Sequence, residues 1–327
     1  MKDTIAVAGL RKCFAEVEAV SEISFNIRHG ELFGFLGPNG AGKTTTINML
    51  TGLARPDTGT ICIGGIDCTG NPRAAQHLVG VVPDESNLYP ELTGFDNLCF
   101  CGALHGLRKG ERQARAQELL DTFDLTKAAD RKFGGYSKGM KRKLAIAAGI
   151  IHRPRILFLD EPTTGIDVAS ARQIRLLIGG LNESGTTVFL TTHYIEEAER
   201  LCDRIGFIVD GRLVRVDTLA NLVKDVEGKY IVQLALSRDP GGLLQQLDGT
   251  FHGVEFETMP GNMLRAHTAQ TLPLGPLVRF FEEHGVDVTE ARAIRPSLED
   301  VFVRITGIAA ERMRKEKEQG KPKGGGA

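Results

Sequence analysis

The feature that most constrains this chain is a glycine-rich segment, GPNGAGKTT, at residues 37–45. It follows the apolar run 32–36, which favours a buried strand, and it leads into TTINML, which favours a helix. A GxxxxGK[ST] pattern between a strand and a helix is typical of a phosphate-binding loop, the P-loop or Walker A motif. Glycines let successive backbone N–H groups point at phosphate oxygens, beside a helix N-terminus with partial positive charge. The chain is therefore predicted to contain an α/β domain that binds phosphate groups.

Within this loop the side chains have distinct expected roles. Lys43 is expected to place a point charge at the β- and γ-phosphates, and the Thr44 hydroxyl to ligate Mg²⁺. The motif by itself leaves kinases, GTPases and motor ATPases open. The residues expected to surround the nucleotide phosphates are Gly37, Asn39, Gly40, Ala41, Gly42, Lys43, Thr44 and Thr45.

A second motif, RPRILFLDEP, supplies two adjacent acids. The apolar residues 156–159 predict a buried strand that ends in Asp160 and Glu161. In α/β sheets, ligands bind at the carboxyl ends of the strands. Because the run is so apolar, the two acids that follow it are better explained as part of a ligand-binding site than as a surface ion pair. Asp160 is therefore predicted to hold Mg²⁺, and Glu161 to polarise a water molecule for attack on the γ-phosphate.

Composition excludes several classes of protein. The 40 Lys and Arg residues balance 41 Asp and Glu residues, so no general attraction to a nucleic-acid backbone is expected. The chain has no run of 18 apolar residues and no signal peptide at its start, which predicts a cytoplasmic protein. Its six cysteines are scattered without a CxxC pair, so neither a zinc site nor a disulfide framework is expected.

The length of 327 residues predicts about two domains. Apolar runs rich in β-branched residues alternate with amphipathic segments to about residue 222, which predicts a largely parallel sheet. The strand signal disappears at about 93–150, which predicts a helical subdomain, and Asp210-Gly211 predicts a hairpin turn. The pattern changes at Gly228, so the first domain is predicted to span 1–227.

Residues 228–307 predict a small α+β accessory domain. The expected order is strand, helix, strand, strand, helix, strand and a final helix capped by Ser297, an order that matches a split βαβ sandwich. This domain contains no clustered His, Cys or paired carboxylates, so we expect it to regulate or dimerise and to carry no chemistry. Residues 308–327 are rich in charge and glycine and are predicted to be a disordered tail.

The order and spacing of four motifs resemble those of ATP-binding cassette (ABC) ATPases. These motifs are GPNGAGKTT, YSKGM, FLDEPTTGID and the Thr191-Thr192-His193 turn, and the resemblance covers about residues 4–222. It implies ATP with Mg²⁺ at the site. It also implies a head-to-tail dimer, with a second copy or a paralogous ATPase, that closes around two MgATP molecules. A further alternative, a P-loop kinase with a phosphate-accepting substrate, accounts for neither Ser137 nor His193.

The segment 136–140 resembles the LSGGQ signature loop of the family. Ser137 and Gly139 are retained, and Lys138 replaces the first glycine of the pair. In the family this loop binds the γ-phosphate of ATP held by the opposite subunit. The resemblance therefore implies that Ser137 and Gly139 complete the site of the partner.

The resemblance assigns four further positions. Asp167 falls on the D-loop, and His193 falls on the switch histidine that contacts the γ-phosphate. Phe14 falls where the family places an aromatic ring under adenine, and stacking requires only a π face. Asp84, after Pro83, stands where the family has the Gln or Glu that makes the lid contact to Mg²⁺ and to the attacking water. Asp84 is expected to reach Mg²⁺ through a bridging water, or else to cap a turn while Glu85 or water takes the role.

The segment RPSLEDVFVRITG, residues 295–307, resembles the C-terminal signature of the ATPase subunits of type-2 ABC exporters, the drug-resistance-like subfamily. That resemblance implies a separate membrane permease beneath which the chain docks, on the inner face of the cell membrane, and it favours export. The alternative is a soluble ABC ATPase acting on ribosomes or DNA, which usually carries two cassettes or a long coiled coil. The transported substrate does not follow from the sequence, because substrate contacts belong to the permease.

Overall fold

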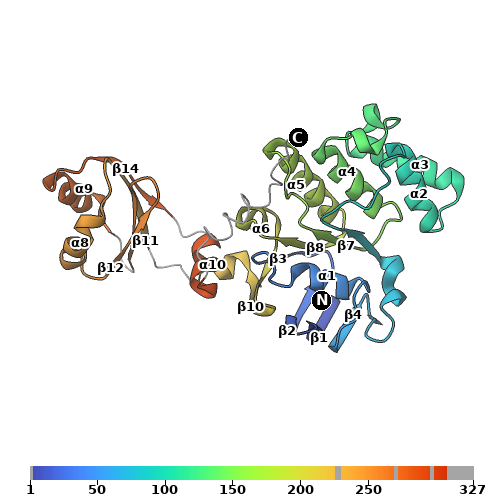
Figure 1. The fold of residues 1–327 in the computed structure, drawn as a ribbon, viewed down its shortest axis with the longest axis horizontal. Coiled ribbons are helices and arrows are strands. Elements are labelled where there is room, and N and C mark those ends of the chain that lie inside the picture. The colour runs from blue at the N-terminus through green and yellow to red at the C-terminus, as the bar shows by residue number, and fades with distance from the viewer. Residues whose placement is uncertain (1–2, 225–229, 269–271, 295–297, 308–327) are drawn as a thin grey trace, which may run out of the picture. The chain divides into compact units, whose positions relative to one another are not determined.

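The computed structural model describes residues 3–224, 230–268, 272–294 and 298–307 (Figure 1). It divides the chain into two compact units, one extending to Leu219 and the other beginning at Ala220. The domain boundary predicted at Gly228 falls in a gap between the described ranges and stays a prediction. The predicted cap Ser297 and the tail 308–327 also lie outside the described residues.

The first unit is built on a six-stranded sheet of order β10-β9-β3-β8-β7-β6. Strands β9, β3, β8, β7 and β6 run parallel, which confirms the predicted α/β class. β10 returns antiparallel to β9 through Asp210 and Gly211, whose positive φ angles of 48° and 76° suit a two-residue turn. The bounds are β3 (Leu32–Leu36), β6 (Val79–Val82), β7 (Ile156–Asp160), β8 (Thr187–Thr192), β9 (Arg204–Val209) and β10 (Arg212–Thr218).

A second, antiparallel sheet packs against the first. Its order is β2-β1-β4-β5, with β1 (Asp3–Phe14), β2 (Val17–Arg28), β4 (Thr58–Ile63) and β5 (Ile66–Asp67). The ring of Phe25 on β2 lies 5.7 Å from that of Phe33 and 6.0 Å from that of Phe189, centroid to centroid. These rings join the two sheets in one core. Apolar alternation predicts strands but not their partners, and for that reason the sequence pattern does not predict this sheet.

Helices surround the sheets, and three of them form the predicted helical subdomain: α2 (Gly94–Leu104), α3 (Lys109–Thr122) and α4 (Lys138–Gly149). Thr93 caps α2 by accepting a hydrogen bond from the Asp96 amide at 3.0 Å. Short 3-10 turns lie at Pro72–Leu78, Thr126–Ala128 and Phe133–Gly135, and the remaining helices of this unit are α1 (Lys43–Leu50), α5 (Val168–Glu183) and α6 (Ile195–Leu201).

The second unit has a four-stranded antiparallel sheet of order β12-β13-β11-β14. The order of its elements along the chain is the predicted split βαβ order. Helices α8 and α9 pack on the sheet through Leu247 and Phe281, which meet Val232 and Leu234 of β11. The elements are α7 (Leu219–Lys224), β11 (Tyr230–Leu236), a 3-10 turn (Gly241–Leu243), α8 (Leu244–Thr250), β12 (Val254–Met259), β13 (Met263–Thr268), α9 (Leu274–Glu283), β14 (Val288–Ile294) and α10 (Leu298–Thr306).

Candidate active site

The phosphate loop connects β3 to α1, and close backbone approaches fix its glycines. A Cβ at Gly37 would lie 2.1 Å from the Ile208 carbonyl oxygen, and one at Gly42 would lie 2.4 Å from the Ala19 oxygen. Gly42 also has a φ of 99°, which L side chains rarely adopt. Gly42 is the N-cap of α1 and offers no side chain to it, so the first N–H groups of this helix stay open for an anion.

Lys43 links the phosphate loop to the end of β7. Its buried Nζ donates to the carbonyl oxygens of Gly37 at 2.7 Å and Pro38 at 3.0 Å. The same ammonium lies 3.1 Å from Oε1 of Glu161. The structure thus brings together the two strongest sequence motifs, which are more than one hundred residues apart.

Glu161 lies at the centre of the site. Its Oε2 accepts hydrogen bonds from the Thr164 hydroxyl at 2.9 Å and from Nδ1 of His193 at 2.7 Å. Burial acts to raise the pKa of Glu161, but His193 and Lys43 outweigh it and hold this pKa below its usual value. The side chain is therefore a carboxylate at neutral pH. It is in the protonation state that a general base requires.

The backbone of Glu161 is itself unusual, with φ at 49°. Non-glycine residues in this region cost about 1–3 kcal/mol and cluster at active sites. The Glu161 amide donates to the carbonyl oxygen of Thr191 at 3.1 Å and to its hydroxyl at 3.2 Å. Strand β8 therefore holds the turn that aims this carboxylate.

Asp160 and Thr44 present the oxygen atoms expected of a Mg²⁺ site. Asp160 is buried at the carboxyl end of β7 and accepts a hydrogen bond from the Thr191 hydroxyl. Thr44 lies exposed on α1, which packs against β7. Among the described residues no three His, Cys, Asp or Glu side chains form a metal cluster. One carboxylate and a hydroxyl fit an ion that takes its other ligands from phosphates and water.

Asp84 lies on the loop after β6, close enough to Asp160 and Glu161 for their charges to affect it. Although Asp84 is exposed, partial desolvation by its neighbours raises its pKa; Arg142 acts to lower this pKa, and Glu161 and Asp160 add to the rise. The structure thus places Asp84 near Asp160, the last residue of β7, and near Glu161, which follows it. Whether it takes the lid role stays a prediction, as does the alternative of Glu85.

The signature loop and the D-loop lie side by side at the starts of α4 and α5. A Cβ at Gly139 would lie 2.5 Å from Oγ of Ser170, which explains the glycine. Ser137 caps α4 by accepting from the Met140 amide at 3.2 Å, and Asp167 caps α5 by accepting from the Ser170 amide at 2.9 Å. Both caps are exposed. Their contacts are local, and their role toward a partner stays a prediction.

Phe14 lies at the end of β1 with 51% of its surface exposed. Nζ of Lys12 lies 5.3 Å from the centroid of its ring and pairs with Asp57 at 2.8 Å. An exposed ring at a strand end is free of the core and is able to stack on a base. Its role under adenine stays a prediction.

The buried charged residues that the sequence analysis did not single out include Arg142 and Glu197, which lie beside the site. Arg142 on α4 donates to main-chain oxygens beside the acids of the site. Glu197 on α6 accepts from the Thr163 hydroxyl at 2.7 Å, and burial raises its pKa. The signal for Arg142 was its position four residues before Ile146, on the buried face of α4.

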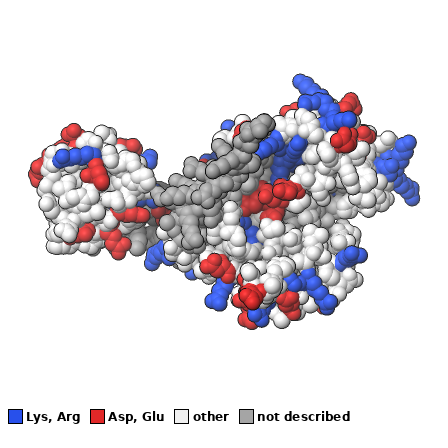
Figure 2. Space-filling model, in the orientation of Figure 1, with Lys and Arg blue, Asp and Glu red and all other residues white. Residues whose placement is uncertain are grey.

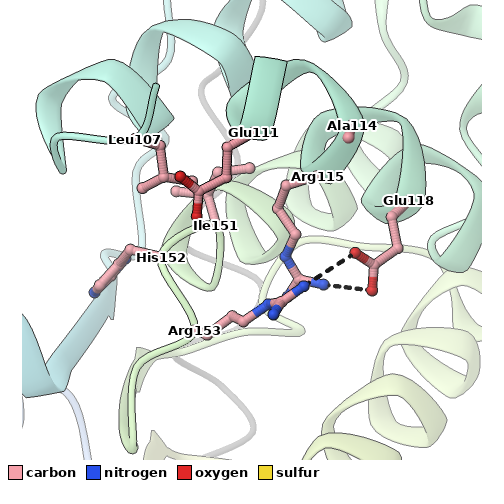
Figure 3. Close-up of a pocket in the computed structure, with 8 residues that line it drawn as sticks. All are labelled: Leu107, Glu111, Ala114, Arg115, Glu118, Ile151, His152 and Arg153. Atoms are coloured by element: carbon pink, nitrogen blue, oxygen red, sulfur yellow. Dashed lines mark hydrogen bonds and ion pairs between the residues drawn. The ribbon is translucent and has the colours of Figure 1, made fainter. Parts of the chain in front are cut away.

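A hollow of about 280 Å³ lies elsewhere, between α3 and the residues that follow α4 (Figure 3). In it Arg115 pairs with Glu118 at 2.6 Å. The rings of His105 and His152 stack at 3.6 Å in the same subdomain, and burial lowers the pKa of His152 to about 4. None of the residues predicted to bind or hydrolyse ATP lines this hollow, and we assign it no chemistry.

Similarity to known proteins identifies the family of this chain. The family described as ABC transporter matches residues 20–164. A linearmycin resistance ATP-binding protein of Bacillus subtilis is 38% identical over 91% of this chain and 96% of its own length. This chain belongs to the ABC transporter family. A daunorubicin resistance ATP-binding protein of Streptomyces coeruleorubidus is 37% identical, over 94% of this chain and 97% of its own.

A Nod factor export ATP-binding protein of Burkholderia lata is 37% identical, over 91% of this ABC chain and 95% of its own. Among solved structures, an ATP-binding subunit of an ABC transporter matches with a TM-score of 0.62 and 28% identity, over 68% of this chain and 92% of that one. A dimeric cassette in a post-hydrolysis state with ADP and Pi matches at 0.61 and 28% identity, over 66% and 98%.

These matches confirm the predicted ABC fold. They also confirm that the chain is an ATPase subunit of an ABC transporter and that its enzymatic activity is ATP hydrolysis. In the part of the chain that the structure describes, no helix is both long and apolar enough to cross a membrane.

Proposed function

We propose that this ATPase powers export through a separate membrane permease. Support comes from its relatives, which are named for antibiotic resistance and for Nod factor export. The alternative of a soluble ATPase on ribosomes or DNA finds no such support. On the face drawn in Figure 2, basic and acidic side chains are interspersed, and a balanced surface of this kind offers no broad attraction to nucleic acid. The chain would then lie in the cytoplasm, held on the inner face of the membrane by the permease.

The observation that carries the mechanism is the pair of contacts from Glu161 to Lys43 and His193. Lys43 and the loop amides would hold the β- and γ-phosphates. Asp160 with Thr44 would hold Mg²⁺, which supplies positive charge to the phosphates when bound. Glu161 would accept a proton from the attacking water, and His193 would contact the γ-phosphate while orienting that carboxylate.

Dimerisation would complete the site. Ser137 and Asp167 are exposed at the starts of α4 and α5, where a second copy is able to reach them. At the start of α4, the N–H groups that Ser137 does not cap suit a phosphate offered by another molecule. In a head-to-tail dimer, the signature loop of one copy would contact the ATP held by the other, and Phe14 would stack on adenine. The second unit would regulate or dimerise, because its described residues hold no comparable cluster.

Replacing the proposed base tests this assignment. Glu161→Gln keeps the size of the side chain and one acceptor oxygen, replaces the other oxygen by an NH₂ donor and removes the basicity. Hydrolysis should fall by about 10²–10⁴-fold while MgATP binding persists. An ATP-bound dimer should then accumulate, detectable by light scattering. Glu196→Gln, an exposed change on α6, is the matched control and should hydrolyse ATP at the normal rate.

Unchanged turnover in the Glu161→Gln variant would remove Glu161 from the mechanism. Membrane association that survives deletion of the permease would instead contradict the proposed partner.

A further inference from the structure

Arg142 carries a buried positive charge that the mechanism above does not use. It lies on α4, immediately after the signature loop, and only 7% of its surface is exposed. Burying an unpaired guanidinium is costly, so the contacts that compensate for it indicate the role of this residue. Burial lowers the pKa of Arg142 below its usual value. The nearby acids Asp84, Asp160 and Glu197 act in the opposite direction, because they favour the charged guanidinium.

The hydrogen bonds of Arg142 join two loops. Its Nε donates to the Pro162 carbonyl oxygen at 3.0 Å, and its Nη2 donates to the Asp160 carbonyl oxygen. These two acceptors flank Glu161. Its Nη1 donates to the carbonyl oxygens of Asp84, at 3.1 Å, and Pro83. One guanidinium therefore holds the backbone on both sides of the proposed base and the backbone of the loop that carries Asp84.

The residue type suits this task. Arginine presents five N–H donors in a rigid planar fork, whereas a lysine ammonium is a compact point charge on a flexible stem. A lysine at position 142 would keep the charge but would lack the fork that reaches carbonyls of two segments at once. The buried apolar residues on the same helix, such as Leu144 and Ile146, already anchor α4 in the core.

From these contacts we infer that Arg142 is a positioning residue for ATP hydrolysis: it fixes the Asp84 loop against the Glu161 turn and connects both to the signature helix. The inference rests on the proposed roles of Glu161 and Asp84. It assigns Arg142 no contact with ATP. Its effect is on where the two carboxylates lie, and a misplacement of about 1 Å at a reacting group is able to cost about 10²-fold in rate.

The test compares Arg142→Met, Arg142→Lys and the matched control Arg115→Met in the full chain, reconstituted with its permease. Arg115 is a part-buried arginine that also donates to a main-chain oxygen, that of Ile150, outside the site. We expect kcat to fall about 10²-fold in Arg142→Met, with the affinity for a fluorescent ATP analogue unchanged. Arg142→Lys should recover part of the turnover, and Arg115→Met should keep all of it.

The split between kcat and nucleotide affinity separates positioning from a loss of folding, because a variant that does not fold loses both. If Arg142→Met does not fold, Arg142→Lys alone decides, because its kcat should still fall below that of the wild type.

Normal kcat in Arg142→Lys and Arg142→Met, or a loss matched by Arg115→Met, would overturn the inference. Such a result differs from failure of the proposed function, in which Glu161→Gln would turn over normally. Weakened binding of the ATP analogue by Arg142→Met would also contradict it, since that outcome assigns Arg142 to the binding of nucleotide.

Discussion

The two units of this protein differ in what they bury. Among its described residues the first unit buries eight acidic, basic or histidine side chains, and six of them lie in or beside the candidate site: Lys43, Arg142, Asp160, Glu161, His193 and Glu197, the other two being Glu31 and Lys143. Within its described residues, the second unit buries two polar side chains, Gln233 and Thr268, and both are neutral. Because buried charge is expensive, it persists where a reaction requires it. The first unit therefore buries charged side chains at its candidate active site, whereas the second unit buries mainly apolar side chains.

The largest effect on ATP affinity is expected when the charge of the phosphate loop is removed, and this change tests the contrast between the two units. Lys43→Ala should weaken ATP binding about 10- to 100-fold, because a hydrogen bond to a charged group contributes about 1.5–3 kcal/mol. Equilibrium titration with a fluorescent ATP analogue measures the change. Lys132→Ala, which removes an exposed lysine paired with Glu91, is the control and should bind normally. Normal affinity in Lys43→Ala would show that this buried charge does not serve ATP.

A smaller effect is expected at Asp84, the acid with a raised pKa. Asp84→Ala should lower the apparent Mg²⁺ affinity of permease-coupled hydrolysis about tenfold, as loss of an indirect metal contact does. In the wild type this affinity should also fall as the pH drops through the raised pKa, because Asp84 then becomes neutral. Asp84→Gln should abolish that part of the pH dependence. Steady-state ATPase assays across Mg²⁺ concentration and pH measure both.

Glu85→Ala is the matched substitution for Asp84, since Glu85 is the adjacent acid and both residues are exposed. If Asp84→Ala leaves the Mg²⁺ dependence untouched while Glu85→Ala abolishes coupling, the lid role belongs to Glu85.

The smallest effect on nucleotide binding is expected from the second unit. Phe281 is fully buried in its core, and Phe281→Ala should destabilise this unit by about 3–5 kcal/mol. ATP affinity should not change, because the two units bury separate cores. Phe158→Ala, at an equally buried position on β7, should reduce both stability and ATP affinity. Calorimetry with the titration above checks both variants, and a loss of binding in Phe281→Ala would erase the contrast between the units.

Much of the fold followed from local patterns. The central parallel strands β3, β7 and β8 are fully buried, so runs such as 156–159 are apolar throughout. The stretch from Thr93 shows helical spacing instead. The antiparallel sheet escaped prediction because a strand such as β2 carries no mark of which strand it pairs with. The hairpin at Asp210 and Gly211 was predictable, since two residues hold the whole turn.

The sequence by itself determined the phosphate loop, the acids after β7 and the family, because each depends on residues that are adjacent in the chain. Only the tertiary structure decided that Glu161 contacts both Lys43 and His193, and that Arg142 holds the carbonyls of Asp84 and Asp160. The physical reason is that these contacts join distant segments. In the case of Arg142 the acceptors are backbone oxygens, which every residue type possesses and which therefore leave no trace in the amino-acid sequence.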